Sequence, residues 1–204
     1  MNAVSQSADG EVRARGRPRD VRVDQSILDA ALDLFLEDGF DTMSIESVAE
    51  RAGVGKTTIY RRWQSKEELV VATIGTLYEG MDVPDTGDVR ADLTTVVRHM
   101  HGLIQNTKAG RALPRMAGEL ARGSPLGHAY MRTVLAPRLE AVGAALQRAE
   151  VRGDLRSDLD VEIAVASIVG PMMFLALTGR IANLDEELAS RLVDQAITGM
   201  KRVD

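Results

Sequence analysis

Apolar residues recur at intervals of three and four along almost the whole of this 204-residue chain. In the first such stretch Ile27, Ala31 and Leu34 fall on one face of a helix, because a helix turns once in about 3.6 residues. No stretch shows the strict alternation of apolar and polar residues that is typical of a β-strand. The sequence therefore predicts an all-α fold.

Glycine and serine residues mark where the first helices begin and end. Gly39 follows the first apolar stretch and is expected to end it. Ser44 is expected to cap a second helix, and Gly53 to end it, because a sharp turn there needs positive φ. A third, short helix is expected to begin near Gly55 or Lys56. Ser65 opens the capping-box pattern "SKEEL", which predicts the start of a fourth helix running toward residue 79.

The stretch "GMDVPDTGD", residues 80–88, concentrates glycine, proline and aspartate, and is therefore expected to be a loop between two regions. Helical patterns follow it over residues 89–106, 109–122, 126–151, 160–178 and 185–201. The expected organisation is a basic arm at 1–19, a small helical domain at 20–67, a connecting helix and loop at 68–87, and a larger helical domain at 88–204.

Positive charge is concentrated near the start of the chain. Residues 13–22 hold five arginines against one acid, and residues 51–66 hold five bases and no acid. The whole chain nevertheless has a formal net charge of -5, which argues mildly against a protein that coats nucleic acid. The distribution is more informative than the sum, and it favours a local basic surface at the N-terminal end.

The stretch "GVGKTTIYRRW", residues 53–63, contains the Gly-Lys-Thr triplet of a phosphate-binding loop. Such a loop needs a further glycine five residues before the second one, but Glu50 stands there, and its carboxylate would repel phosphate. It must also follow a β-strand, whereas residues 44–52 are patterned as a helix. Two independent requirements fail, so a nucleotide-binding loop is not expected.

The same stretch meets the requirements of a helix-turn-helix. A helix is followed by a tight turn at Gly53 and then by a short helix with an exposed polar face. Ile59 and Trp63 are expected to pack inward, while Lys56, Thr57, Thr58 and Arg61 face outward, where they can reach bases and phosphates in the major groove. The alternative is a surface helical hairpin with solvated basic residues.

The segment "TMSIESVAERAGVGKTTIYRRWQSKEELV" resembles the DNA-binding region of the TetR family of bacterial transcriptional repressors, over about residues 24–70. By that resemblance Tyr60 and Lys66 would hold DNA phosphates. The expected DNA-contacting residues of this region are Ser44, Lys56, Thr57, Thr58, Tyr60, Arg61 and Lys66.

The basic arm offers a second possible DNA contact. The stretch "RARGRPR" at residues 13–19 includes Arg15, Arg17 and Arg19, and a flexible arginine arm can enter the narrow minor groove of A·T-rich DNA. The alternative is a solvated tail that raises only nonspecific attraction to phosphate.

The later stretches "VPDTGDVRADL", "LAPRLEAV" and "RGDLRSDLDVEIA" resemble the C-terminal domain of one TetR subgroup, which implies a helical domain for ligand sensing and dimerisation. Residues 163–178 are apolar nearly all round, so this helix must be buried on most sides. Two copies could bury it in a four-helix interface, although packing within one chain is the alternative. The expected interface residues are Ile168, Phe174, Leu188, Leu192, Ala196 and Met200.

Methionine and other apolar residues on the middle helices predict a pocket for a small, largely apolar effector. For each of them, ordinary core packing is the alternative, and Glu119, His99 and Arg115 are the polar groups expected to orient a ligand or, alternatively, to face water. The expected effector-binding residues are His99, Leu103, Met116, Glu119, Leu120, Tyr130, Met131, Val134 and Met172.

Several classes of function lack the residues they need. The chain has no cysteine, and His99 and His101 are two residues apart, which places them on different faces of a helix. No Gly-x-Ser-x-Gly motif is present. We therefore expect no metal, no cofactor and no catalytic residue. No run reaches the ~20 apolar residues of a membrane span, and the N-terminus has no secretory apolar region, so we expect a cytoplasmic protein.

The sequence thus predicts a homodimeric regulator that binds an inverted repeat in double-stranded operator DNA. We expect a repressor that is released by its effector, without contact to a membrane. The alternative is a helical dimeric protein with an enzymatic or scaffold role, in which the DNA-binding domain is vestigial.

Overall fold

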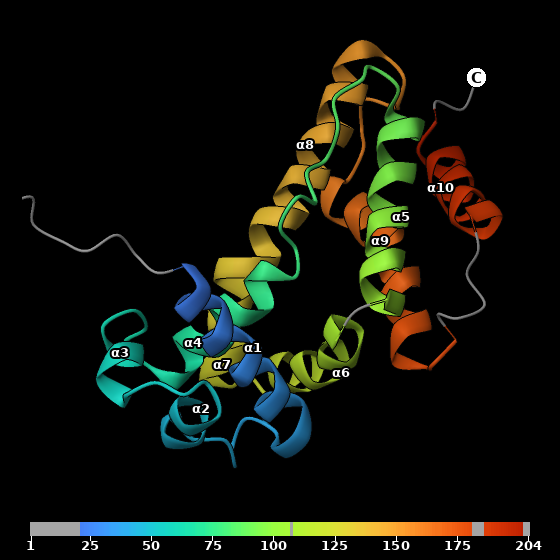
Figure 1. Ribbon diagram of the computed structural model, residues 1–204. Coiled ribbons are helices and arrows are strands. Elements are labelled where there is room, and N and C mark those ends of the chain that lie inside the picture. The colour runs from blue at the N-terminus through green and yellow to red at the C-terminus, as the bar shows by residue number, and fades with distance from the viewer. Residues whose placement is uncertain (1–20, 107, 181–185, 202–204) are drawn as a thin grey trace, which may run out of the picture.

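The computed structural model describes residues 21–106, 108–180 and 186–201, and over these residues the chain is helical and contains no strand, which confirms the all-α prediction. The N-terminal end consists of α1 (Val21–Asp38), α2 (Ile45–Arg51), α3 (Lys56–Tyr60) and α4 (Lys66–Thr76). Figure 1 shows these helices gathered at one end of the molecule, with α3 at its tip.

The remaining helices form the other end. They are α5 (Val89–Asn106), α6 (Lys108–Ala121), α7 (Pro125–Tyr130), the π-helical turn η1 (Met131–Leu135), α8 (Ala136–Arg152), α9 (Val161–Leu177) and α10 (Glu186–Met200). In Figure 1, α5, α8, α9 and α10 stand together, while α6 and α7 lie between them and α1–α4.

The expected single helix over residues 126–151 is interrupted by η1. The amide of Ala136 donates to the carbonyl of Met131, five residues back, instead of four. Pro137 follows at the start of α8 and has no amide to donate to the carbonyl four residues before it. The proline ring also crowds that carbonyl, and a wider π-turn relieves both problems while the chain stays helical.

The N-terminal helices enclose a tightly packed apolar core. Ile27, Phe35, Ile59 and Leu69 have at most 1% of their surface exposed. The core does not end with α4, because Met116 of α6 and other residues of α6, α7 and η1 belong to the same buried cluster. The helix-turn-helix end therefore rests directly on the middle helices.

Polar contacts join α1 to α6 across this boundary. The Lys108 ammonium pairs with Asp33 at 2.5 Å. The Arg115 guanidinium donates to the carbonyl of Leu36 at 2.8 Å, which satisfies an unpaired carbonyl in the last turn of α1.

The second core lies among α5, α8, α9 and α10, where Leu93, Leu146 and Met172 are fully buried. Helices α5 and α10 are in contact, and at the surface Arg90 of α5 forms an ion pair with Asp194 of α10. Among the described residues, no helix combines the length and the apolar character needed to cross a bilayer.

Candidate DNA-binding surface and effector cavities

The turn between α2 and α3 has the geometry of a helix-turn-helix. Gly53 adopts φ +66, as the sequence predicts, and the amide of Val54 donates back to the carbonyl of Ala49 at 2.9 Å. Gly55 is extended and precedes α3. Because the segment before Gly55 is the helix α2, the strand that a phosphate-binding loop requires is replaced by a helix, and the nucleotide-binding alternative is excluded.

Helix α3 presents a polar face to solvent. Ile59 is completely buried beneath it, whereas Lys56, Thr57 and Tyr60 are exposed. Arg61 at its C-terminal end is also exposed. Thr58 is half-buried, and Trp63 packs against the core as expected. The structure thus brings the sequence-predicted contacts of α3 together on one short, accessible helix.

Lys56 is held by a partner on the preceding helix. Its ammonium donates to a carboxylate oxygen of Glu46 at 2.7 Å. This hydrogen bond raises the pKa of Lys56 and lowers the pKa of Glu46. Both side chains are exposed, so water screens the pair and it contributes little to stability.

Lys66 lies more deeply than an ordinary surface lysine. Its ammonium donates to the carbonyls of Phe40 at 2.7 Å and Met43 at 3.0 Å, and it stands 4.3 Å from the centre of the Phe40 ring. The side chain therefore ties the start of α4 to the turn between α1 and α2. An ammonium has three N–H groups, so one remains for a phosphate.

Ser44 acts as the expected cap of α2. Its hydroxyl accepts from the amide of Ser47 at 3.1 Å, while the Ser47 hydroxyl accepts from the amide of Ser44. Ser65 likewise accepts from the amide of Glu68 at 3.1 Å. Arg15, Arg17 and Arg19, the expected minor-groove residues, lie outside the described residues.

Arg62 was not singled out from the sequence, although it orients α3. Its guanidinium pairs with Asp24 of α1 and donates to the carbonyl of Thr58 at 3.0 Å. Only 9% of its side chain is exposed. No spacing rule links residues 24 and 62, so this contact could be found only from the fold.

The larger helical domain contains a hollow space between α6, α7, α8 and α9. This main cavity has a volume of about 810 Å³ and mostly apolar walls. Met116, Leu120 and Tyr130, which the sequence predicts as effector-binding residues, line it. A volume of this size is typical of a site for a small organic molecule.

A side cavity of about 300 Å³ adjoins it, between α5, α8 and the segment after α4. Leu103, another expected effector-binding residue, lines this space. The two cavities share part of their walls, which makes them neighbouring chambers of one apolar region. The shared residues are Leu113, Leu135, Leu139, Val169 and Met173.

The other expected effector residues lie elsewhere. His99 and Met131 are exposed, whereas Val134 and Met172 are buried in the two cores. Glu119 is buried, but its carboxylate already forms an ion pair with Arg122 and accepts a hydrogen bond from the Ser124 hydroxyl at 2.6 Å. None of these five is part of the lining of either cavity.

Two polar residues that the sequence did not single out stand at the side cavity. The Tyr78 hydroxyl lies 3.0 Å from that of Tyr130, and Arg138 lies 4.5 Å from the centre of the Tyr78 ring. Burial raises the pKa of both tyrosines, so both hydroxyls are protonated and one can donate to the other. Tyr78 directly follows α4, and this contact therefore links the main cavity to the helix-turn-helix end.

Helix α9 presents an apolar stripe to solvent. Ile163, Phe174 and Leu177 are 65%, 59% and 49% exposed. Of the other expected interface residues, Ile168 and Met200 are buried in the chain's own core, whereas Leu188, Leu192 and Ala196 are half-buried on α10.

Within the described ranges, no group of three or more metal-ligating side chains is assembled.

A helix-turn-helix attached to a hollow helical domain defines a class of DNA-binding regulators, and comparison with known proteins identifies the family. Residues 27–73 match the family described as "Bacterial regulatory proteins, tetR family". Residues 83–196 match the family described as "Tetracyclin repressor-like, C-terminal domain". The chain belongs to the TetR family of DNA-binding transcriptional regulators, a family of regulators rather than enzymes.

Individual relatives match most of the chain. The HTH-type transcriptional regulator YdeS of Bacillus subtilis is 32% identical over 189 residues, which cover 92% of this chain and 94% of YdeS. The DNA-binding transcriptional repressor TetR of Mycobacteroides abscessus is 33% identical over 190 residues, which cover 90% of this chain and 94% of that repressor. Among solved structures, the TetR family transcription regulator SCO0332 is 30% identical in sequence and superposes with a TM-score of 0.68. The match covers 89% of this chain and 100% of the SCO0332 chain.

Proposed function

We propose that this protein is a homodimeric repressor that leaves its operator when a small, largely apolar effector fills the main cavity. In this proposal the protein acts on DNA in the cytoplasm and catalyses no reaction, and it needs no cofactor. The observation that carries the proposal is the main cavity, which opens to solvent, has mostly apolar walls and has a volume of about 810 Å³. A concave, mostly apolar space of this size suits a small organic ligand.

The tyrosine pair supports a route from the cavity to the DNA-binding helices. Tyr130 lines the main cavity and contacts Tyr78, which follows α4. Val134 of η1 lies against α4 at Gly75. A ligand that displaces α7 and η1 would therefore shift α4, and with it the orientation of α3 relative to the partner copy. Such a shift weakens DNA binding only if the two copies must match a fixed half-site spacing.

We assign the DNA contacts to the N-terminal domain at 20–67 and to the arm at 1–19. The exposed residues of α3 would reach bases and phosphates, Lys66 and Ser44 would contact phosphate at the edge of the site, and the arm arginines would enter the minor groove. The assigned residues are Arg15, Arg17, Arg19, Ser44, Lys56, Thr57, Thr58, Tyr60, Arg61 and Lys66.

We assign dimerisation to the exposed stripe of α9 together with α10, within the domain at 88–204. Ile163, Phe174 and Leu177 expose large apolar surfaces that a second copy would cover. A two-fold axis through this contact would place two α3 helices on the same face, so that the operator is an inverted repeat.

A gel-shift assay with DNA flanking the protein's own gene tests this function. We expect one fragment containing an inverted repeat to be retarded. Arg61→Ala should weaken that binding by about tenfold, because it removes an exposed, positively charged side chain at the C-terminal end of α3. Arg132→Ala is the matched control, since Arg132 is an exposed arginine of η1. If no fragment is retarded, or if both variants bind alike, the assignment to operator binding is wrong.

A further inference from the structure

Arg138 is a partly buried cation with an unused donor. It lies on α8 and lines the side cavity. One of its terminal nitrogens (Nη1) donates to the carbonyl of Val134 at 2.5 Å, and its guanidinium lies over the Tyr78 ring. Its Nε–H is buried and has no hydrogen-bond partner among the residues that the structure describes. A buried donor without a partner costs free energy, and in a native protein it needs an explanation.

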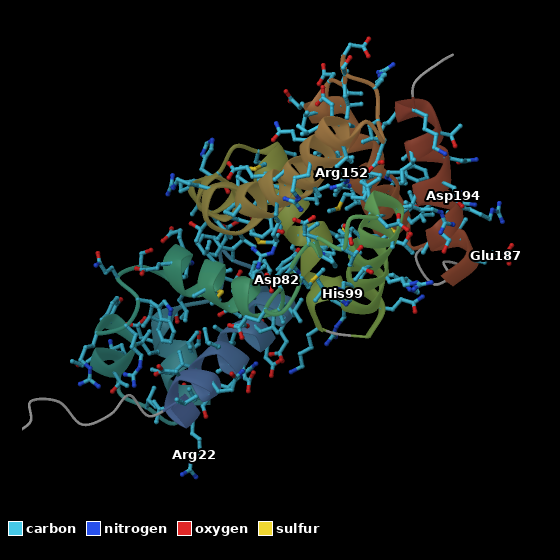
Figure 2. The ribbon with its side chains drawn as sticks, turned by 90° about the horizontal axis from the view of Figure 1, so that it is seen from above. Arg22, Asp82, His99, Arg152, Glu187 and Asp194 are labelled. Carbon is cyan, nitrogen blue, oxygen red and sulfur yellow. The ribbon has the colours of Figure 1, made fainter. Side chains whose placement is uncertain are left out.

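Arg138 also lacks a counter-ion among the described residues. Over the part of the chain that the structure describes, no carboxylate lies within ion-pair distance of its guanidinium. Asp82 lines the same cavity, but it is exposed on the segment that joins α4 to α5. Figure 2 shows Asp82 near the middle of the molecule, between the N-terminal helices and α5. A partly buried cation without an anion beside it is a favourable position for a bound anion.

The surroundings of Arg138 are apolar. Leu135 and Leu139, its neighbours on η1 and α8, line both cavities, so the guanidinium stands beside the wall between the two chambers. Two carboxylates, Glu140 and Glu162, also line the main cavity, but both are exposed to solvent. Arg138 is the basic residue among the lining residues of the two spaces.

From this arrangement we infer that the effector is an amphiphilic carboxylate. Its anionic head pairs with the guanidinium of Arg138 in the side cavity, and its aliphatic body extends into the main cavity when the side chains shared by the two walls, such as Leu139 and Met173, move apart. Guanidinium groups suit this task because their donors match both oxygens of a carboxylate. The head also lies beside Tyr78, at the contact with Tyr130, where occupancy of the site can be transmitted to α4. The inference rests on the proposed function, because it names the chemistry of that function's effector.

Three probes with one aliphatic chain and different heads test the inference: decanoate, decanol and decylammonium. Their affinities for the full-length protein are measured by isothermal titration calorimetry at neutral pH, below the concentration at which each probe forms micelles. Decanoate should bind about tenfold or more tightly than decanol, as expected for a hydrogen-bonded charge, and decylammonium should bind most weakly. Equal affinities, or tightest binding of decylammonium, would overturn the inference.

Two variants test whether Arg138 causes the preference for decanoate over decanol. Arg138→Gln should bring the decanoate-to-decanol affinity ratio close to one. Arg148→Gln, the same substitution on the same helix, should keep the wild-type ratio, because Arg148 pairs with Asp85 and lines neither of the two cavities. The ratio is insensitive to a loss of folded protein, since both probes meet the same sample. A ratio that Arg138→Gln leaves unchanged would contradict the role of Arg138.

The gel shift separates this inference from the function on which it rests. Wild-type protein that retards its operator but does not prefer decanoate contradicts the carboxylate inference alone. Protein that prefers decanoate through Arg138 but binds no operator fragment contradicts the repressor function, while the assignment of the carboxylate site to Arg138 stands.

Discussion

The N-terminal helices α1–α4 and the helices α5–α10 differ in how completely their side chains fill the space between them. Around α1–α4, large side chains such as Phe35, Ile59 and Leu69 are buried with almost no exposed surface. Around α6, α8 and α9, residues such as Leu139 and Met173 border open space instead. Under the proposed function, the first region holds one fixed shape, whereas the second admits a ligand and responds to it.

Truncating one leucine in each region should show the difference most strongly. Leu69→Ala should lower the free energy of unfolding by about 3–5 kcal/mol, because it leaves a new cavity in a packed core. Leu139→Ala should cost only about 1 kcal/mol, since its side chain already borders both cavities. Urea unfolding followed by circular dichroism measures both. Equal losses would mean that the two regions are equally well packed.

The apolar stripe of α9 should matter for assembly and not for the fold of one chain. Phe174→Asp should weaken the dimer by about 30-fold or more and abolish operator binding, while leaving the secondary structure intact because residue 174 is exposed. Val151→Asp is the control, since Val151 is 89% exposed on α8. Sedimentation velocity distinguishes the outcomes. A Phe174→Asp protein that remains dimeric would exclude the stripe as the interface.

Two lysines of the N-terminal region should separate structural from DNA-contacting roles. Lys66→Ala should lower the free energy of unfolding by about 1–2 kcal/mol and also weaken operator binding, because the ammonium donates to two carbonyls. Lys56→Ala should weaken or alter operator binding and leave stability unchanged, since its partner Glu46 is at the surface. Unfolding curves and fluorescence anisotropy with labelled operator test both. Identical behaviour of the two variants would contradict the distinction.

The smallest expected effect concerns the tyrosine contact between the regions. Tyr130→Phe removes one hydroxyl of the pair and should cost about 1 kcal/mol of stability. It should also reduce the factor by which decanoate weakens operator binding. Thr133→Val removes an exposed hydroxyl from η1 and should leave that factor unchanged. If both variants retain the wild-type factor, the contact does not carry the coupling.

The same difference explains what could be predicted from the sequence. The caps at Ser44 and Ser65, the positive φ of Gly53 and the buried position of Ile59 follow from local rules, and the structure confirms them. The helical segments after residue 88 were also predicted, apart from the π-turn that accommodates Pro137.

The positions of the cavities could not be predicted from local sequence patterns. Helical periodicity shows that Met116 and Met172 face inward, but it does not show that one borders open space and the other is packed on all sides. Tyr78 and Arg138 are 60 positions apart in the numbering and meet only because the turn after α4 lies beside the start of α8. Their contact depends on tertiary packing, as does the pairing of Arg62 with Asp24.

The central claim is that the hollow region and the DNA-binding helices are energetically coupled, and reciprocal binding measurements test it most directly. The operator affinity is measured with and without saturating decanoate, and the decanoate affinity with and without saturating operator. Coupling of a typical size predicts that decanoate weakens operator binding by about 5- to 150-fold, and that operator weakens decanoate binding by the same factor. If decanoate binds in the cavity and neither affinity depends on the other ligand, the two regions are independent and the account is wrong.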